Sequence, residues 1–163
     1  MQIKSHDAYV NRAMLTAREA LVGMRVRAVA KRHATVRLLM PAPGVGPITA
    51  MAVVAAFDDA SCFRRSSAGA CLGVTPRRYK SGEISRNGRL SKRGDGVAMK
   101  CPFEAANAIF CRKPGGPRLR DRANAIAERT GPRKATVALA RKLVVTLHSM
   151  WRTNTPFREA VVA

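Results

Sequence analysis

Apolar residues recur every three or four positions through the N-terminal part of the chain. Arginines fall mostly between them, so the pattern predicts one long amphipathic helix over residues 6–32 with an exposed basic face. Helical character continues over residues 34–41, where Pro41 and Pro43 are expected to stop it. The recurring apolar residues are Val10, Ala13, Met14, Ala17, Leu21, Met24 and Ala28.

The next segment, PAPGVGPITAMAVVAAF, combines a Gly-Val-Gly turn with a run of small apolar residues. Pro47 suits the first position of a helix, and this order is typical of a helix-hairpin-helix. Gly44 and Gly46 allow a tight turn and leave backbone N–H groups uncovered beside the positive end of the helix, so a phosphate oxygen could bind there. The alternative is an ordinary turn between two helices that binds no ligand.

A basic connector follows this segment. We expect a short helix at residues 66–72, capped by Gly73, and then a loop or short basic hairpin over residues 74–94. Gly82 and the pair Asn87–Gly88 are the turn signals in that connector.

Three helical patterns make up the rest of the chain, at residues 95–111, 118–129 and 133–152. Pro102 is expected to interrupt the first of them, and the segment from Thr153 onward is expected to fray. Only 5% of the residues are aromatic while 47% are apolar, which favours a mainly α-helical fold with an aliphatic core. The clearest apolar stripe, on the last helix, comprises Val137, Ala140, Leu143, Val144, Leu147, Met150 and Trp151.

The charge balance indicates a polyanionic partner. The 163 residues include 30 Lys or Arg but only 10 Asp or Glu, so the net charge is +20, and the basic residues are spread through every segment. Such a surface favours nucleic acid. A membrane partner is not expected, because no basic amphipathic stretch carries Trp or Phe anchors. The apolar run Pro47–Phe57 is also far below the ~20 residues that cross a bilayer.

The start of the sequence, MQIKSHDAYV, lacks the apolar core of a signal peptide, so we expect a cytoplasmic protein. Cys62, Cys71, Cys101 and Cys111 are spaced too widely to form metal-binding pairs, and the three histidines do not fall near them. We therefore expect reduced thiols and no metal site in this chain.

The stretch GVTPRRYKSGEISRNGRLSKRG surrounds Ser81 with basic side chains. A serine that attacks a phosphodiester needs a base or metal to take its proton and cations to spread the charge on phosphorus. Gly82 leaves room beside the serine and Tyr79 could stack or donate a hydrogen bond, but Glu83 is the only carboxylate and the stretch contains no His. From the residues alone, such a serine is more often a turn former than a nucleophile. The cations are Arg77, Arg78, Lys80, Arg86, Arg89, Lys92 and Arg93.

Three blocks, in this order, resemble the C-terminal domain of insertion-sequence transposases of the 110/116/902 group: LMPAPGVGPITAMAVVAAF, FRRSSAGACLGVTPRRYKSGEISRNGRLSKRG and KATVALARKLVVTLHSMWRTNTPF. The resemblance covers residues 36–157 and implies a role in DNA transposition in a bacterial cytoplasm, in association with the nucleoid. It also implies that Ser81 forms a covalent phosphoserine link with DNA. In this family a RuvC-like domain with a DEDD set of metal-binding acids and a coiled coil precede the serine-bearing domain, and a bridge RNA selects the DNA.

The glycine turn and the basic block together form the predicted DNA-binding set. Its members are Gly44, Gly46, Arg77, Arg78, Tyr79, Lys80, Gly82, Arg86, Arg89, Lys92 and Arg93.

Two departures from the family pattern indicate a truncated and internally deleted copy. Residues 1–33 resemble the last helix of the RuvC-like domain, so the DEDD acids would lie upstream and Mg²⁺ is expected only with that missing domain. RVRAVAKRHATVRLLMPAPG then runs almost directly into the glycine turn, where the family has its coiled coil. We expect the family domain at residues 34–157, a frayed tail at 158–163, no strand transfer by this chain alone, and a homo-oligomer only if it can form without the coiled coil.

Two other functions fit part of the pattern. One is a nucleic-acid-binding helix-hairpin-helix module without catalysis, and the other is a basic RNA-binding or ribosome-associated protein, which does not explain the Tyr-x-Ser-Gly block. Of the remaining polar residues, His148 is expected to be packed and Trp151 to belong to the core. Arg141 and Lys142 suit phosphate contact and a solvated surface equally. The other serines near the block, expected to cap helices or turns, are Ser66, Ser67, Ser85 and Ser91.

Overall fold

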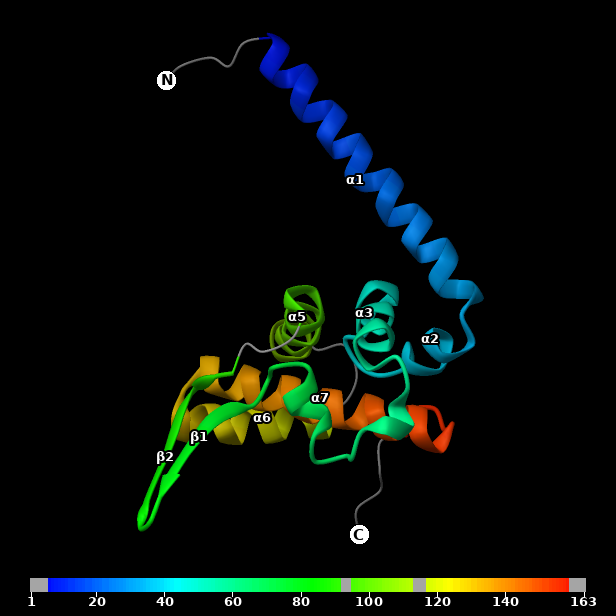
Figure 1. Cartoon of the computed structure of the whole chain (residues 1–163). Coiled ribbons are helices and arrows are strands. Elements are labelled where there is room, and N and C mark those ends of the chain that lie inside the picture. Colours follow the sequence, from blue (N-terminus) through cyan, green and yellow to red (C-terminus); the bar gives the residue numbers. More distant parts are fainter. Residues whose placement is uncertain (1–5, 92–94, 113–116, 159–163) are drawn as a thin grey trace.

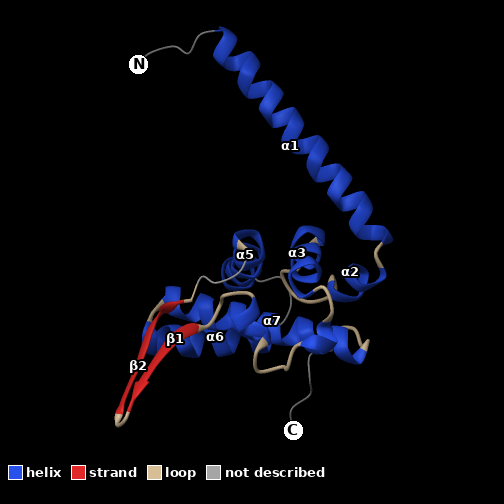
Figure 2. Ribbon diagram, in the orientation of Figure 1, coloured by secondary structure: helices blue, strands red, loops and turns tan. Residues whose placement is uncertain are grey.

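The computed structural model describes residues 6–91, 95–112 and 117–158. These residues form a mainly α-helical fold with one two-stranded antiparallel hairpin, so the predicted fold class is confirmed (Figure 2). The elements in chain order are α1 (His6–Arg32), α2 (Ala34–Leu39), α3 (Pro47–Phe57), the 3-10 helix η1 (Ala60–Cys62), α4 (Ala68–Cys71), β1 (Pro76–Ser81), β2 (Ile84–Leu90), α5 (Gly96–Arg112), α6 (Pro117–Thr130) and α7 (Pro132–Thr153).

Helix α7 is the central helix of the core. It contacts α2, α4, α5, α6 and η1, and its predicted apolar stripe faces these partners (Figure 1). Leu143, Val144 and Leu147 are fully buried, whereas Val137 and Trp151 at the ends of the stripe are half-buried. Because one helix buries its stripe against five neighbouring elements, α7 joins segments from α2 to α6 in one core.

His148 is packed inside this core, as predicted. Its side chain is fully buried, and its ring lies 5.5 Å from the ring of Phe57, between centroids. The Nε2 atom lies 3.0 Å from the carbonyl oxygen of Ala60, so the tautomer that carries a proton on Nε2 can donate a hydrogen bond there. Trp151 also packs against Phe57, with ring centroids 6.4 Å apart, which supports its predicted place in the core.

Helix α5 is continuous from Gly96 to Arg112, so the prediction that Pro102 interrupts it is wrong. Pro102 is buried and lies on the same helix as the buried residues Ala98, Ala105 and Ile109. Packing of this face against α3 and α7 offsets the backbone hydrogen bond that proline cannot donate.

The C-terminal segment is ordered further than predicted. Asn154 ends α7 in the left-handed conformation with φ of 48°, and the N–H of Thr155 donates to the carbonyl of Met150 at 3.1 Å. Phe157 then packs against the hydrophobic core. The prediction that the chain frays from Thr153 onward is therefore wrong as far as Arg158, and residues 159–163 lie outside the described residues.

Helix α1 has the predicted bounds but extends away from the helical body (Figure 1). Ala30, near its C-terminal end, is its one buried residue in the described part of the chain. Larger apolar side chains on this helix are more than half exposed, including Tyr9, Met14, Leu15 and Leu21. The pattern therefore predicted the helix correctly, while the structure leaves its apolar residues uncovered.

Candidate nucleic-acid interface

The basic block folds as a hairpin, which is one of the two conformations that the sequence predicted, the other being an irregular loop. Strands β1 and β2 pair antiparallel, and Ser81 pairs with Ile84 across the two-residue turn Gly82–Glu83 (Figure 2). Gly82 has φ of +54°, and a two-residue turn with glycine in its first position matches the type II′ preference. The predicted turn signal at Gly82 is confirmed.

The second turn signal, Asn87–Gly88, is wrong as a turn because both residues lie within β2. The register shifts between Pro76 and Arg78, so that two residues of β2, Gly88 and Arg89, stand opposite Arg77 as in a β-bulge. A Cβ on Gly88 would lie 2.7 Å from Cε2 of Tyr79. The Tyr79 ring therefore packs directly against Gly88 across the hairpin, and a larger residue there would displace the ring.

Strand register determines which side chains share a face with Ser81. Directly paired residues point to the same face, and residues two apart along a strand do so as well. The pairs Ser81–Ile84 and Tyr79–Arg86 therefore share one face, and the pair Lys80–Ser85 lies on the other. The first face forms an open hollow of about 370 Å³, whose rim also includes Lys80.

Ser81 is exposed at the tip of this hairpin, and Tyr79, Lys80 and Arg86 beside it are exposed too. Figure 1 shows the hairpin extending beyond the helices, so its tip is accessible to a large ligand. Glu83, in the turn, is also exposed. The structure thus places the serine hydroxyl among cations and an aromatic ring, in reach of a polyanion.

The other predicted cations of the block lie away from the hairpin tip or outside the described residues. The guanidinium of Arg77 donates to the carbonyl of Ser91 at 3.3 Å and so holds the base of the hairpin. Arg78 and Arg89 lie within the paired strands. Lys92 and Arg93 lie outside the described residues.

The glycine turn before α3 lies apart from the hairpin tip (Figure 1). Gly44 has φ of +70°, and a Cβ there would lie 2.6 Å from the carbonyl oxygen of Ala105 in α5. Gly46 is the N-cap of α3, and no atom lies within 4 Å of the position its Cβ would take. The two glycines therefore have different surroundings: Gly44 is packed against another helix, and Gly46 is open at the start of α3.

The described residues offer no ligand set for a metal. Throughout residues 6–91, 95–112 and 117–158, no three His, Cys, Asp or Glu side chains gather closely enough to hold an ion. Cys62, Cys71, Cys101 and Cys111 are free, and burial raises the pKa of the Cys71 and Cys101 thiols. Among the described helices, none has the length and apolar character needed to cross a bilayer.

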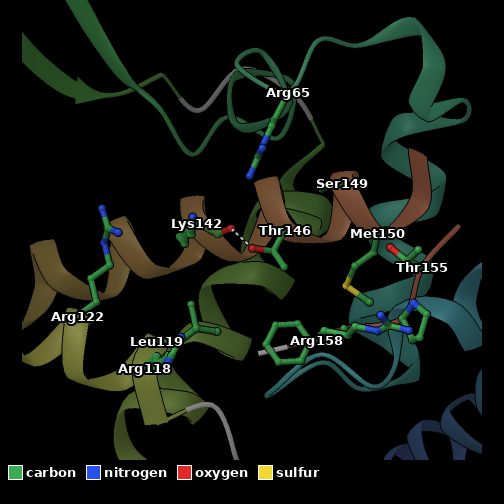
Figure 3. A pocket seen from close by; sticks show the side chains of 12 residues that line it. Arg65, Arg118, Leu119, Arg122, Lys142, Thr146, Ser149, Met150, Thr155 and Arg158 are labelled. Atoms are coloured by element: carbon green, nitrogen blue, oxygen red, sulfur yellow. Dashed lines mark hydrogen bonds between the residues drawn. The ribbon is translucent and has the colours of Figure 1, made fainter. Parts of the chain in front are cut away.

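Sequence reasoning missed a second basic hollow, which we call the α6–α7 pocket (Figure 3). Its cationic residues come from four separate segments of the chain, so no local spacing could have revealed it. Lys142 is the one residue of this group for which the sequence suggests phosphate contact. The cationic lining residues are Arg65, Arg118, Arg122, Lys142 and Arg158.

The glycine turn and the hairpin both lie in a part of the chain that matches a known protein family. Residues 36–124 match the family described as "Transposase IS116/IS110/IS902 family", a range that runs from α2 into α6 and contains both features. The chain belongs to this transposase family. The resemblance of residues 36–124 is thereby confirmed, and α7 follows the matched range.

Two curated transposases are similar to this chain. A "Probable family 20 transposase" of Pseudomonas aeruginosa is 35% identical over 96 residues, which cover 58% of this chain and 28% of that protein. The "Transposase for insertion sequence element IS1111A" of Coxiella burnetii is 32% identical over 119 residues, which cover 72% of this chain and 33% of that protein. The matched part of the chain thus spans about a third of the length of these relatives.

Proposed function

We propose that this chain is the DNA-binding, serine-bearing part of an insertion-sequence transposase, and that Ser81 is its nucleophile. The observation that carries the proposal is the exposed position of Ser81 at the hairpin tip, on one face with Tyr79 and Arg86. A hairpin that extends beyond the helices can lie along a DNA backbone, because no helix lies beside its tip (Figure 1).

In the proposed step the Oγ of Ser81 forms a bond to the phosphorus of a phosphodiester, and the bond from phosphorus to one strand oxygen breaks. The proton of the serine hydroxyl passes to a base, and the leaving oxygen takes a proton. Arg86 and Lys80 offset the negative charge that builds on the phosphoryl oxygens. Tyr79 supplies a ring that can pack against a sugar or base.

The base and the metal-binding acids belong to another part of the transposase in this proposal. Glu83 is the one carboxylate between Gly73 and Ser91, and a single carboxylate does not form a two-metal site. The family resemblance would assign Mg²⁺, a bridge RNA and a multimeric assembly to the whole protein. The proposal includes the metal ion, the bridge RNA and the multimeric assembly, and it includes the inactivity of this chain on its own.

A second candidate is a nucleic-acid-binding module without catalysis. The observation that favours it is the open N-terminal end of α3 at Gly46, which together with the exposed basic hairpin can bind phosphate without a nucleophile. Both candidates bind DNA through the hairpin, so affinity does not separate them. Formation of a covalent link does.

The test uses Ser81→Ala with Ser85→Ala as its matched control. Ser85 is also an exposed serine of the hairpin, but it lies on the opposite face, paired with Lys80. Each chain is mixed with labelled DNA from the ends of the insertion sequence, Mg²⁺, and the separately produced acidic domain and bridge RNA of a full-length relative. Protein–DNA adducts are then counted on a denaturing gel.

We expect an adduct with the unaltered chain and with Ser85→Ala, and a loss of at least about 10³-fold with Ser81→Ala, because the nucleophile is absent. The affinity of Ser81→Ala for DNA should stay within about twofold, since a hydroxyl adds little to a charge-driven complex. An adduct that survives in Ser81→Ala excludes this serine. DNA binding without an adduct in any mixture supports the non-catalytic module.

A further inference from the structure

The α6–α7 pocket lies on the outer side of α6 and α7, where the segment after η1 and the C-terminal segment meet them. Its volume is about 510 Å³. Figure 3 shows that the lining arginines come from different parts of the chain: Arg65 from the segment after η1, Arg118 and Arg122 from α6, and Arg158 from the chain after α7. The extension of the chain to Arg158 thus forms one wall of the pocket.

The charges of this pocket are of one sign. Four arginines and Lys142 line it, and no Asp or Glu is among its lining residues. Five cationic side chains from separate segments thus line one hollow, and an anion bound there would interact favourably with them. Arginine is also the side chain whose planar donor fork matches the oxygens of a phosphate.

The rest of the lining is apolar or carries hydroxyl groups. Leu119, Met150 and Phe157 contribute apolar surface, and Ser149 and Thr155 contribute hydroxyl groups. Thr146 donates to the carbonyl of Lys142 at 2.9 Å, which stabilises the turn of α7 that carries Lys142 (Figure 3). A site for inorganic phosphate alone needs neither this volume nor the apolar surface, whereas a nucleotide uses both.

We infer that the α6–α7 pocket binds a single nucleotide that is turned out of a DNA duplex, with its phosphate against the cations and its base against the apolar residues. Bases within an intact duplex are stacked and cannot enter such a pocket, so an unpaired nucleotide is the preferred ligand. The inference rests on the proposed function in so far as DNA is the ligand of the chain. It adds a binding site separate from the hairpin.

The experiment compares three fluorescent duplexes of one sequence by anisotropy at constant salt. The first is fully paired, the second has one unpaired nucleotide in its centre, and the third has an abasic residue at that unpaired position. The pocket variant is Arg122→Gln with Lys142→Gln. The matched control is Arg129→Gln with Lys134→Gln, which changes exposed residues of the same two helices outside the pocket.

We expect the unaltered chain to bind the duplex with the unpaired nucleotide roughly tenfold more tightly than the paired one, the lower range for stacking one base on an aromatic side chain. The abasic duplex should lose most of this preference. The pocket variant should bind both duplexes within about twofold of each other, while its matched control keeps the preference. Thermal unfolding followed by circular dichroism verifies that both variants are folded.

The inference is overturned if the unaltered chain binds the paired duplex and the duplex with the unpaired nucleotide equally tightly, or if the pocket variant keeps the preference. Neither result bears on the proposed role of the hairpin. Arg86→Gln provides the separation, because it should weaken binding of both duplexes equally and leave their ratio unchanged. Failure of the chain to bind any of the duplexes counts against the proposed function itself.

Discussion

Gly44 and Gly46 stand in one turn, but only the first of them is required by its surroundings. Gly44 adopts φ of +70°, a conformation that residues with a Cβ rarely take, and it packs directly against the backbone of Ala105. Gly46 adopts an ordinary extended conformation with open space beside it. A role in anion binding is therefore open to Gly46, at the start of α3, while Gly44 serves helix packing.

We predict opposite effects for alanine at these two positions. Gly44→Ala should lower the free energy of unfolding by about 2–4 kcal/mol, because strain at positive φ adds to overpacking against α5. Gly46→Ala should leave it within about 0.5 kcal/mol. Urea unfolding followed by circular dichroism measures both, and equal effects of the two substitutions would contradict the packing role of Gly44.

Helix α1 contributes little to the packed body. Its contacts are with α2 and α3, and Ala30 is the residue it buries among the described residues. A helix of 27 residues without a packed face depends on intrinsic propensity, which is marginal in water. The exposed apolar residues of α1 therefore do not stabilise the rest of the described fold.

We predict that deletion of residues 1–28 changes the melting temperature of the body by less than about 2 °C, because the deletion removes no buried residue of the described core. The helical signal in far-ultraviolet circular dichroism should fall with the loss of α1. A thermal scan of both chains measures these quantities. If the shorter chain melts more than about 5 °C lower, α1 packs against the body in solution.

The hairpin is attached to the helical body by hydrogen bonds at its base. A two-stranded hairpin is marginal on its own in water. Here the N–H of Ser91 donates to the carbonyl of Thr75 at 3.0 Å, and the Ser91 hydroxyl donates to the carbonyl of Gly73 at 3.4 Å. These bonds tie the base of the hairpin to the chain that follows α4, while the tip with Ser81 depends on the strand pairing and the Gly82 turn.

The molecule as a whole carries a charge of +20, so every nucleic-acid complex it forms should depend on salt. The cations that contact phosphate in the complex determine how steeply the affinity falls with salt concentration. The hairpin tip offers Lys80 and Arg86 near Ser81, whereas Arg25 is exposed on α1. Salt dependence can therefore map the binding surface.

We predict that Lys80→Gln and Arg86→Gln each reduce the slope of log Kd against log salt concentration by about 1, because each removes one phosphate contact. Arg25→Gln, which changes another exposed arginine, on α1, should leave the slope unaltered. Anisotropy titrations of a paired duplex from 50 to about 300 mM salt measure the slopes. Equal slopes for all three variants would show that binding is spread over the surface and not focused on the hairpin.

Local patterns determined most of the secondary structure. The bounds of α1, α3 and α7 follow from helical periodicity and from prolines such as Pro47, and these signals act within a few residues. The position of the hairpin turn did not follow from the local pattern, because the same stretch contains two turn signals, Gly82 and Asn87–Gly88. The pairing of Ser81 with Ile84 places the turn at Gly82, which has φ of +54°, and leaves Asn87 and Gly88 inside β2.

The helices, the basic character, the family resemblance and Ser81 as a candidate nucleophile could all be predicted from the amino-acid sequence. Tertiary structure alone decided that Ser81 shares a face with Tyr79 and Arg86, that Gly44 is a packing residue, and that the apolar residues of α1 are uncovered. It also brought five cations from four segments into one pocket. Helix propensity and capping depend on residues that are close together in the sequence. Core packing and the grouping of cations in one pocket depend on contacts between residues that are far apart in it, so the sequence pattern does not reveal them.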